Sequence, residues 1–320
     1  LQRVYFALEQ LHGTADERRT ASGKFEPTTG TWPAEERFAI ARARACAARC
    51  RVMRIEQIWT GNDFRNFHYL IACSQTGEAL VVDPLDHALC LSRAQALGLQ
   101  ITQIVNTHEH TDHTGGNEPL RAATGALLLA HDRAGAAIAG IDRGLSAGDV
   151  IRVGKTVELR VLDTPGHTMS HVCLFAQGDG SGLQSALICG DTLFNAGAGN
   201  CHHGGDPHVL YRTFVDQLAQ LPDDTRVYPG HDYIARNLGF TLDREPDNAA
   251  AAALLPQVAE QDMSRPLVTT MAQERQVNTF LRLGSPSVQA GLRRAIPGLP
   301  PDALSPETVF VKLRELRNRW

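Results

Sequence analysis

The sequence predicts an α+β protein, in which two series of strands and helices form a layered sandwich that is followed by a helical C-terminal domain. Two observations support this fold class. Short apolar runs typical of strands alternate with helical stretches between residues 53 and 190, and after residue 228 only helical spacing recurs. A length of 320 residues also exceeds what one ordinary core needs, so we expect about two domains.

The first domain is expected to begin at Met53. An Arg/Ala-rich segment ends there and gives way to Met-Arg-Ile-Glu-Gln-Ile, in which apolar and polar residues alternate as in a strand. We therefore assign residues 1–52 to an N-terminal extension of unknown role, with one helix expected over 35–49. The sandwich is assigned to residues 53–227 and the helical domain to residues 228–320.

The expected elements follow from hydrophobic periodicity. After the strand at Met53, strands are expected at Tyr69–Cys73, Ala79–Asp83, Ile101–Asn106 and Ala126–Ala130, with helices at Asp86–Leu97 and Gly116–Ala123. A second series of strands is expected at Val157–Leu162, His171–Phe175 and Ala186–Cys189. In the helical domain, helices are expected at Asn248–Glu260, Val268–Leu281 and Pro306–Arg319, and no strand is expected beyond Tyr228.

Composition excludes several classes of partner. The sequence has 31 Lys and Arg against 35 Asp and Glu. This charge is too balanced for a surface that binds along a nucleic acid duplex. The longest apolar runs fall far short of the roughly 20 residues that span a bilayer, so no membrane partner is expected. Seven scattered cysteines and the lack of a secretory or transit pattern favour a reducing, cytoplasmic location.

The strongest chemical signal is the segment Thr-His-Glu-His-Thr-Asp-His at residues 107–113, which directly follows an apolar strand. In an extended segment, residues two apart project to the same side, so His108 and His110 can bind one metal ion together. Asp112 and His113 lie just past the strand end and face differently, so they are free to hold a second ion.

Three further candidates, His167, Asp191 and His231, occupy a shared setting: each follows an apolar strand and stands beside glycine. Glycine lets the backbone turn tightly next to an ion. Taken together, five histidines and two aspartates suit a pair of divalent cations, since imidazole favours zinc or iron and a carboxylate can bridge two ions. Metal coordination lowers the pKa of water from 15.7 to about 7, so the reaction class we expect is hydrolysis.

Four motifs, taken in order, resemble the metallo-β-lactamase superfamily: His-x-His-x-Asp-His, Thr-Pro-Gly-His, Gly-Asp-Thr-Leu-Phe and Pro-Gly-His-Asp-Tyr. Within it, the sequence is most similar to the glyoxalase II family, the hydroxyacylglutathione hydrolases, across residues 53–320. The match includes Asn117, Thr168 and the segment Asn-Thr-Phe-Leu-Arg at residues 278–282. The resemblance implies an αβ/βα four-layer sandwich with a helical C-terminal domain.

The resemblance also implies how the ligands divide. One metal would take His108, His110 and His167, the other Asp112, His113 and His231, and Asp191 would bridge them, so Asp112 and Asp191 are also the catalytic candidates. Two divalent ions per chain follow, with zinc preferred and iron or manganese as alternatives. A hydroxide shared by the ions would attack a thioester carbonyl and expel a thiolate, which leaves without a dedicated general acid.

The substrate implied is a hydroxyacylglutathione such as S-lactoylglutathione. Arg314 and Arg317, three apart on an expected helix, resemble the basic pair that binds the glycine carboxylate, and Tyr233 matches a further family contact. After its bridging aspartate the family has a basic residue and an aromatic ahead of a Glu-Gly pair. Here Asn200 and His202 offer hydrogen bonds in place of that fixed charge, so a different acyl thioester or thiol carrier is an alternative.

Other functions compete with thioester hydrolysis. A mononuclear iron persulfide dioxygenase of the same superfamily would contain the His108 motif, but the helical C-terminal domain and the terminal arginines favour hydrolysis. A lactonase or other acyl hydrolase would use the same hydroxide. An inactive metal-binding module is expected to lack a ligand, and the ligand pattern is complete.

Several other residues have two interpretations. Cys46 and Cys50 could chelate a metal, but no second pair follows, so we take them as incidental. Asp83 and His171 could orient metal ligands or be ordinary hydrogen-bonded core residues. A cluster of three histidines could hold a third ion or lie in a loop beside the substrate: His202, His203 and His208.

Overall fold

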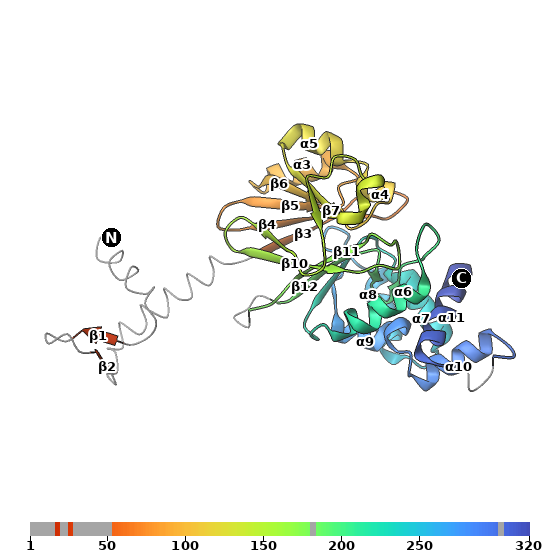
Figure 1. Cartoon of the computed structure of the whole chain (residues 1–320). Helices are drawn as coiled ribbons and strands as arrows, with labels where there is room; N and C mark the ends of the chain where they lie inside the picture. The colour runs from red at the N-terminus through yellow and green to blue at the C-terminus, as the bar shows by residue number, and fades with distance from the viewer. Residues whose placement is uncertain (1–16, 20–24, 28–52, 180–183, 300–303) are drawn as a thin grey trace. The chain divides into compact units, whose positions relative to one another are not determined.

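The computed structural model describes residues 17–19, 25–27, 53–179, 184–299 and 304–320 (Figure 1). The chain divides into two compact units, Leu1–Arg49 and Cys50–Trp320. In the first unit, strands β1 (Glu17–Arg19) and β2 (Phe25–Pro27) pair antiparallel. The helix expected over 35–49, with Cys46 and Cys50, lies outside the described residues.

The second unit contains two six-stranded sheets. The first sheet consists of β3 (Met53–Trp59), β4 (Phe67–Cys73), β5 (Glu78–Val82), β6 (Gln100–Val105), β7 (Leu127–His131) and β8 (Arg143–Leu145). Its strands β3, β4 and β5 pair antiparallel, and β5 to β8 pair parallel. The second sheet has the order β16-β15-β12-β11-β10-β9: β9 (Val150–Val153), β10 (Val157–Asp163), β11 (Val172–Ala176), β12 (Ala186–Gly190), β15 (Arg226–Pro229) and β16 (Thr269–Thr270).

Helices form the two outer layers (Figure 1). Beside the first sheet lie α3 (His87–Ala96), the single turn α4 (Thr111–Thr114) and α5 (Asn117–Thr124). Beside the second sheet lie α6 (Pro207–Asp216), α7 (Ile234–Arg244), α8 (Ala249–Ala259), α9 (Met271–Val277), α10 (Pro286–Ala295) and α11 (Pro306–Arg319). The short strands β13 (Leu193–Phe194) and β14 (Gly197–Ala198) form a hairpin after β12.

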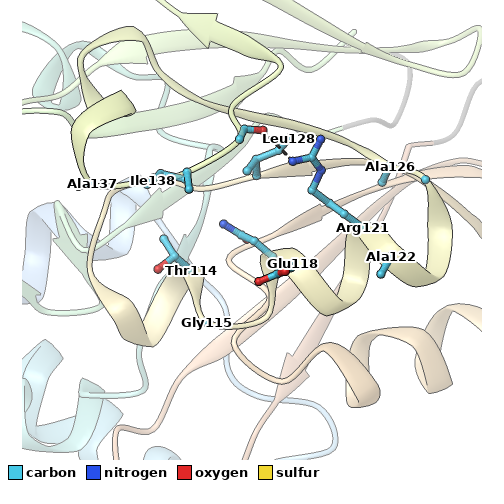
Figure 2. A pocket seen from close by; sticks show the side chains of 13 residues that line it. Thr114, Gly115, Glu118, Arg121, Ala122, Ala126, Leu128, Ala137 and Ile138 are labelled. Atoms are coloured by element: carbon cyan, nitrogen blue, oxygen red, sulfur yellow. Dashed lines mark hydrogen bonds between the residues drawn. The ribbon is translucent and has the colours of Figure 1, made fainter.

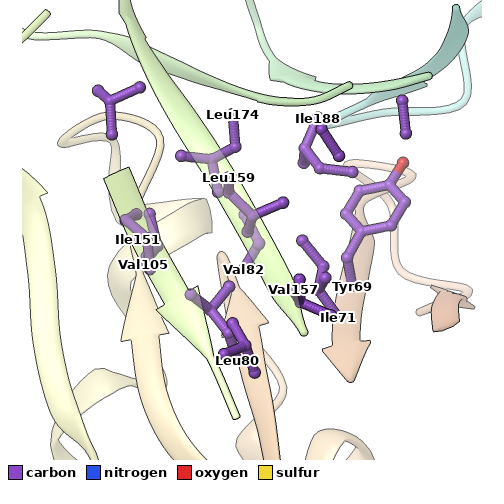
Figure 3. Close-up of a cluster of buried hydrophobic side chains, with 14 of the residues drawn as sticks. Tyr69, Ile71, Leu80, Val82, Val105, Ile151, Val157, Leu159, Leu174 and Ile188 are labelled. Atoms are coloured by element: carbon purple, nitrogen blue, oxygen red, sulfur yellow. The ribbon is translucent and has the colours of Figure 1, made fainter. Parts of the chain in front are cut away.

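Three apolar layers hold this sandwich together, because both sheets are covered on both faces. On β4, Tyr69 and Ile71 face the second sheet, while Leu70 belongs to the cluster shared with α3 and α5. On β12, Ile188 faces the first sheet and Leu187 packs with the C-terminal helices. Figure 3 shows the central layer, in which side chains from β4, β5 and β6 meet those from β9, β10, β11 and β12.

The predicted fold class is confirmed: the structure is an αβ/βα sandwich with a helical C-terminal region. One expectation is wrong, because a strand does occur beyond Tyr228. The segment expected as one helix over Val268–Leu281 instead forms β16, which pairs antiparallel with β15, then α9 and a 3₁₀ turn, η4 (Thr279–Leu281). Thr270 caps α9 in a capping box with Gln273, and this begins the helix two residues after β-branched Thr269.

Within the described ranges, none of the helices is both long and apolar enough to cross a membrane.

We propose that residues 1–52 are dispensable for the site, because β3 begins at Met53 and every candidate ligand follows it. A variant that starts at Met53 is expected to retain the circular dichroism spectrum, the bound metal and the turnover of the full chain. Aggregation or loss of metal in this variant would place the extension within the fold and contradict the assigned boundary.

Candidate metal centre and adjoining pocket

The structure brings all seven predicted metal-binding residues together. His108, His110 and His167 offer ring nitrogens that lie within 4.8 Å of one another. A carboxylate oxygen of Asp112 and ring nitrogens of His113 and His231 form a second set with the same spacing. His108, His113 and Asp191 form a third such set, which overlaps the first two. Every one of these residues stands in the segment that follows a strand end: β6, β10, β12 or β15.

The histidines are oriented by their outer ring nitrogens. The Nδ1 of His167 lies 2.6 Å from the carbonyl oxygen of Asn200, and the Nδ1 of His231 lies 2.7 Å from that of Phe64. The Nε2 of His110 lies 3.3 Å from the carbonyl oxygen of His203. A carbonyl only accepts, so each of these nitrogens must carry the proton and the other ring nitrogen must carry a lone pair.

Asp83 orients the two remaining histidines. Its carboxylate accepts from the Nδ1 of His113 at 3.0 Å and from the Oγ1 of Thr107 at 2.7 Å. Because the Thr107 hydroxyl proton is used in that bond, its oxygen accepts from the Nδ1 of His108, which lies 3.0 Å away. Both histidines therefore also present a lone pair on Nε2 to the interior of the site.

The lone pairs point at one another. The Nε2 of His108 lies 3.0 Å from the Nδ1 of His110, which lies 3.1 Å from the Nε2 of His167. The Nε2 atoms of His113 and His231 are 3.2 Å apart. When these rings are neutral, no proton lies between the paired nitrogens, and the contacts are repulsive unless a cation shares the lone pairs. The residues therefore fit metal ions.

Asp191 lies between the two sets of ligands. Its Oδ2 is 3.2 Å from the Nε2 of His231 and 3.6 Å from that of His167, and its Oδ1 is 3.6 Å from the Nε2 of His113. Burial would raise the pKa of Asp191, but His231 and His113 outweigh burial and hold the pKa well below its usual range. The buried Oδ1 has no hydrogen-bond partner among the described residues, as expected of an ionised oxygen that serves as a metal ligand.

Burial and neighbouring carboxylates shift the pKa values of the site histidines. Burial lowers the pKa of His108 well below its ordinary value and that of His167 to about 4, which keeps both neutral and able to bind a metal. Burial also acts on His113, but the carboxylates of Asp191 and Asp83 raise its pKa to about 9. The position of His113 is therefore one at which positive charge is favoured.

Glycine is required at two points around the site. A Cβ atom on Gly230 would lie 2.2 Å from the Oδ1 of Asp191, so a side chain there would displace the bridging candidate. Gly190 has φ of +45° and packs against the side chains of Thr107 and His171, which likewise leaves no room for a Cβ.

A second feature adjoins this centre: a cavity of about 640 Å³ lined by four arginines, which we name the arginine pocket. Its cations are Arg65, Arg236, Arg314 and Arg317. The pocket also takes in the other predicted substrate contacts, Tyr233, Asn200 and His202. It is contiguous with the metal centre, because the Tyr233 ring stacks on His231 at 5.0 Å and Asn200 orients His167.

The two arginines of α11 differ in role. Arg314 is 5% exposed, and its Nη1 donates to the carbonyl oxygens of Ala198 at 2.5 Å and Gly199 at 3.1 Å. These residues immediately precede Asn200, so Arg314 fixes the backbone that orients His167. Arg317 is half-buried and donates to the side-chain oxygen of Asn237 at 3.0 Å.

The residues with two interpretations are now placed. Asp83 and His171 both touch the centre: His171 accepts from the backbone N–H of Asp191 at 3.2 Å and is held by the hydroxyl groups of Thr164 and Thr192. His208 instead pairs with Glu307 at 2.9 Å. Among the described residues, no candidate metal group includes His202, His203 or His208.

Sequence reasoning missed the residues that act through backbone atoms and amides. The side chain of Asn66 donates at 3.2 Å to both the carbonyl and the Oδ2 of Asp112, and so fixes that ligand. Arg65 pairs with Asp232, which leaves its charge neutralised at the edge of the arginine pocket. Nothing in the sequence around Asn66 signals this role, since the contact spans 46 residues.

Another cavity, of about 730 Å³, lies between α5 and the segment around residue 138 (Figure 2). Arg121, which lines it, is already bound to Asp142 and to the carbonyl of Gly140. The polar residues Thr114, Asn117 and Glu118 also line it, beside apolar residues such as Ala122 and Ile138, and none of the seven predicted metal-binding residues is among its lining.

Comparison with known proteins agrees with this geometry. Residues 63–231 match the metallo-beta-lactamase superfamily, and the fold and the His/Asp cluster able to bind metal are those of that superfamily. Residues 232–320 match the family described as the hydroxyacylglutathione hydrolase C-terminus. The chain belongs to the hydroxyacylglutathione hydrolase family.

Individual relatives support this assignment. The hydroxyacylglutathione hydrolase of Polaromonas sp. is 64% identical over 270 residues, and that of Nitrosococcus oceani is 61% identical; each alignment covers 84% of this chain and all of the relative. Among solved structures, ETHE1 from Myxococcus xanthus superposes with a TM-score of 0.57 at 25% identity, over 81% of this chain and all of that one.

Proposed function

We propose that this chain hydrolyses a hydroxyacylglutathione thioester, such as S-lactoylglutathione, to the hydroxy acid and free glutathione. The observation that carries the proposal is the arginine pocket, which shares Asn200 and Tyr233 with the metal centre. A carrier with carboxylates can therefore bind beside the reacting atoms. The family's dedicated C-terminal region, matched over residues 232–320, supplies Arg236, Arg314 and Arg317 to this pocket.

The residues that would hold the metal ions are His108, His110 and His167 for one site, Asp112, His113 and His231 for the other, and Asp191 for both. We propose two divalent ions, with zinc preferred because five neutral imidazoles dominate the donor set. Bound there, such ions supply a hydroxide at neutral pH and polarise a carbonyl oxygen.

The protein side chains position this chemistry. The carbonyls of Asn200, Phe64 and His203 hold three imidazoles in the required tautomer, and Asp83 does the same for His113. A thiolate leaving group has a pKa of about 8.5, so no side chain needs to protonate it. This agrees with the pocket, which is lined by four arginines that stay charged.

A cytoplasmic location is part of the proposal. Five cysteines in the described part of the chain are free thiols: Cys73, Cys90, Cys173, Cys189 and Cys201. Free thiols at this number are typical of a reducing compartment, where glutathione is also abundant as a thiol carrier.

The assay that tests the proposal compares thioester cleavage with oxygen consumption, alongside metal analysis of the purified protein. We expect thiol release from S-lactoylglutathione, loss of that activity on chelation and its return with zinc. The alternative of an iron persulfide dioxygenase is not favoured, because the hydroxyacylglutathione hydrolase C-terminal family matches this chain. Oxygen uptake with a persulfide substrate by a protein carrying one iron would overturn the hydrolase assignment.

For the α11 arginines we expect separable effects. Replacing Arg317 with Ala should raise KM for the glutathione thioester about tenfold with little change in kcat, because a charge-assisted hydrogen bond to the glycine carboxylate is lost. Arg314→Ala should additionally lower metal content, since Arg314 supports the backbone that orients His167. Arg319→Ala, on the exposed end of the same helix, is the matched control and should change neither. An unchanged KM in Arg317→Ala would show that this arginine does not touch the substrate.

A further inference from the structure

Arg236 is one of the four cations that line the arginine pocket. No hydrogen bond or ion pair joins its guanidinium to any residue that the structure describes, although Arg236 is exposed and lines the pocket. It also stands in the first turn of α7, where the helix dipole is positive and where no acidic residue compensates. A positive charge at a helix N-terminus destabilises the folded protein. Binding of an anionic ligand is the simplest explanation for an arginine at this position.

Like charges surround Arg236. Burial, and after it the nearby charge of Arg236, lower the pKa of Arg317 to about 10. The pKa of Arg314 is lowered to about 9 by burial, by Arg317 and by Arg236. The cluster therefore favours an anion beyond what the described side chains provide, because the carboxylate of Asp232 is already paired with Arg65.

The α11 arginines have donors left for one carboxylate. Arg314 uses Nη1 and Nε on Ala198, Gly199 and Asn318, and Arg317 uses Nη2 and Nε on Asn237. One terminal nitrogen of each remains, which matches the two oxygens of a single carboxylate. A substrate with a second carboxylate therefore needs another cation, and Arg236 is available in the same pocket.

The arginine pocket also contains an exposed acidic side chain. Asp63 also lines the arginine pocket and is exposed, and in the described part of the chain its side chain has no ion-pair partner. An unpaired arginine and an unpaired aspartate on one pocket are complementary to an α-amino acid group, which carries a carboxylate and an ammonium on one carbon. Glutathione has one such group, at the γ-glutamyl end far from its thiol.

We propose that Arg236 binds the α-carboxylate, and Asp63 the α-ammonium, of the γ-glutamyl residue of the substrate. This inference rests on the proposed function, in which glutathione is the thiol carrier. Arg236 then supplies, from α7, a fixed positive charge that the segment around Asn200 and His202 does not carry. The pocket volume of about 640 Å³ lies within the range of roughly 300–1,000 Å³ for small-molecule sites.

The test uses lactoyl thioesters of three thiols: glutathione, a 4-aminobutyryl-cysteinylglycine that lacks the α-carboxylate, and a glutaryl-cysteinylglycine that lacks the α-ammonium. We expect Arg236→Gln to raise KM for the glutathione thioester by at least about tenfold and to leave KM for the 4-aminobutyryl analogue unchanged. Asp63→Asn should show a smaller rise that disappears with the glutaryl analogue, because exposed ion pairs contribute less.

Arg293→Gln is the matched control, since Arg293 is an exposed helical arginine of α10 that does not line the pocket. It should not change KM for any of the three thioesters. A thioester of glutathione whose glycine carboxylate is an amide separates the two carboxylates: its KM should no longer respond to Arg317→Ala, whereas its sensitivity to Arg236→Gln should persist.

The outcomes are distinguishable. If Arg236→Gln raises KM equally for the glutathione and 4-aminobutyryl thioesters, Arg236 does not bind the α-carboxylate and the inference is wrong. The same conclusion follows if the wild-type enzyme hydrolyses all three thioesters with one KM. If the wild type hydrolyses no glutathione thioester at all, the proposed function itself fails.

Discussion

Asp191→Asn is expected to reduce hydrolysis by at least 10²-fold and to lower the metal content, more than the loss of any single outer ligand does. The reason is electrostatic. Asp191 lies between both sets of histidines, and its low pKa keeps a negative charge there. The two proposed dications would repel each other at short distance, and the carboxylate would contribute the charge that lets both bind. An amide keeps the shape but removes that charge. Metal analysis and thioester assays on the same preparation measure both effects.

A control is available in Asp163→Asn. Asp163 also ends a strand, but its side chain is directed to His131 rather than to the centre. This variant should keep its metal and turnover. If Asp191→Asn retained two ions per chain and near wild-type activity, the bridging role of Asp191 would be wrong.

Asp83→Asn is expected to weaken metal binding about 10- to 100-fold although Asp83 is not itself among the proposed ligands. Its carboxylate accepts three donors: the backbone N–H of Thr107 at 2.8 Å, the Thr107 hydroxyl and the Nδ1 of His113. An amide must turn its own N–H₂ towards one of them. His113 or Thr107 then loses its partner, and through Thr107 the tautomer of His108 is released as well.

The substitution suits this position because Asp83 has φ of +51°, a backbone conformation that asparagine tolerates. The fold should therefore persist, and competition with a chelator of known affinity would isolate the effect on metal binding. Asp86→Asn is the control: Asp86 caps α3 nearby through Leu89, so its loss should not change metal affinity. Equal metal affinity in Asp83→Asn and the wild type would show that the tautomers are set by other contacts.

The elements with strong local signals could be predicted from the sequence. The bounds of α11 agree at both ends, because Ser305 caps a helix whose first residue is Pro306. The segment at residues 268–281 could not be predicted as three elements. The break at Asn278 is stabilised by contacts distant in sequence, since its side chain donates to the carbonyl of Gly197 and caps Phe280.

The candidate site was predictable to a similar degree. Its ligand types and their grouping could be anticipated from motifs, whereas the carbonyls of Phe64 and Asn200 that orient them could not, because a backbone oxygen has no residue-type signature. The positive charge of the arginine pocket could not be predicted from the sequence for another reason. Arg65 and Arg236 are 171 positions apart and only the folded chain places them on one wall.

The bonds from Arg314 to the carbonyls of Ala198 and Gly199 carry a consequence for biosynthesis. All seven proposed ligands leave the ribosome well before α11, whose first residue is Pro306. Until α11 docks, the backbone that orients His167 lacks its support. The nascent chain therefore has the ligands of the centre without their final geometry, and stable uptake of metal is expected only after α11 has emerged and docked.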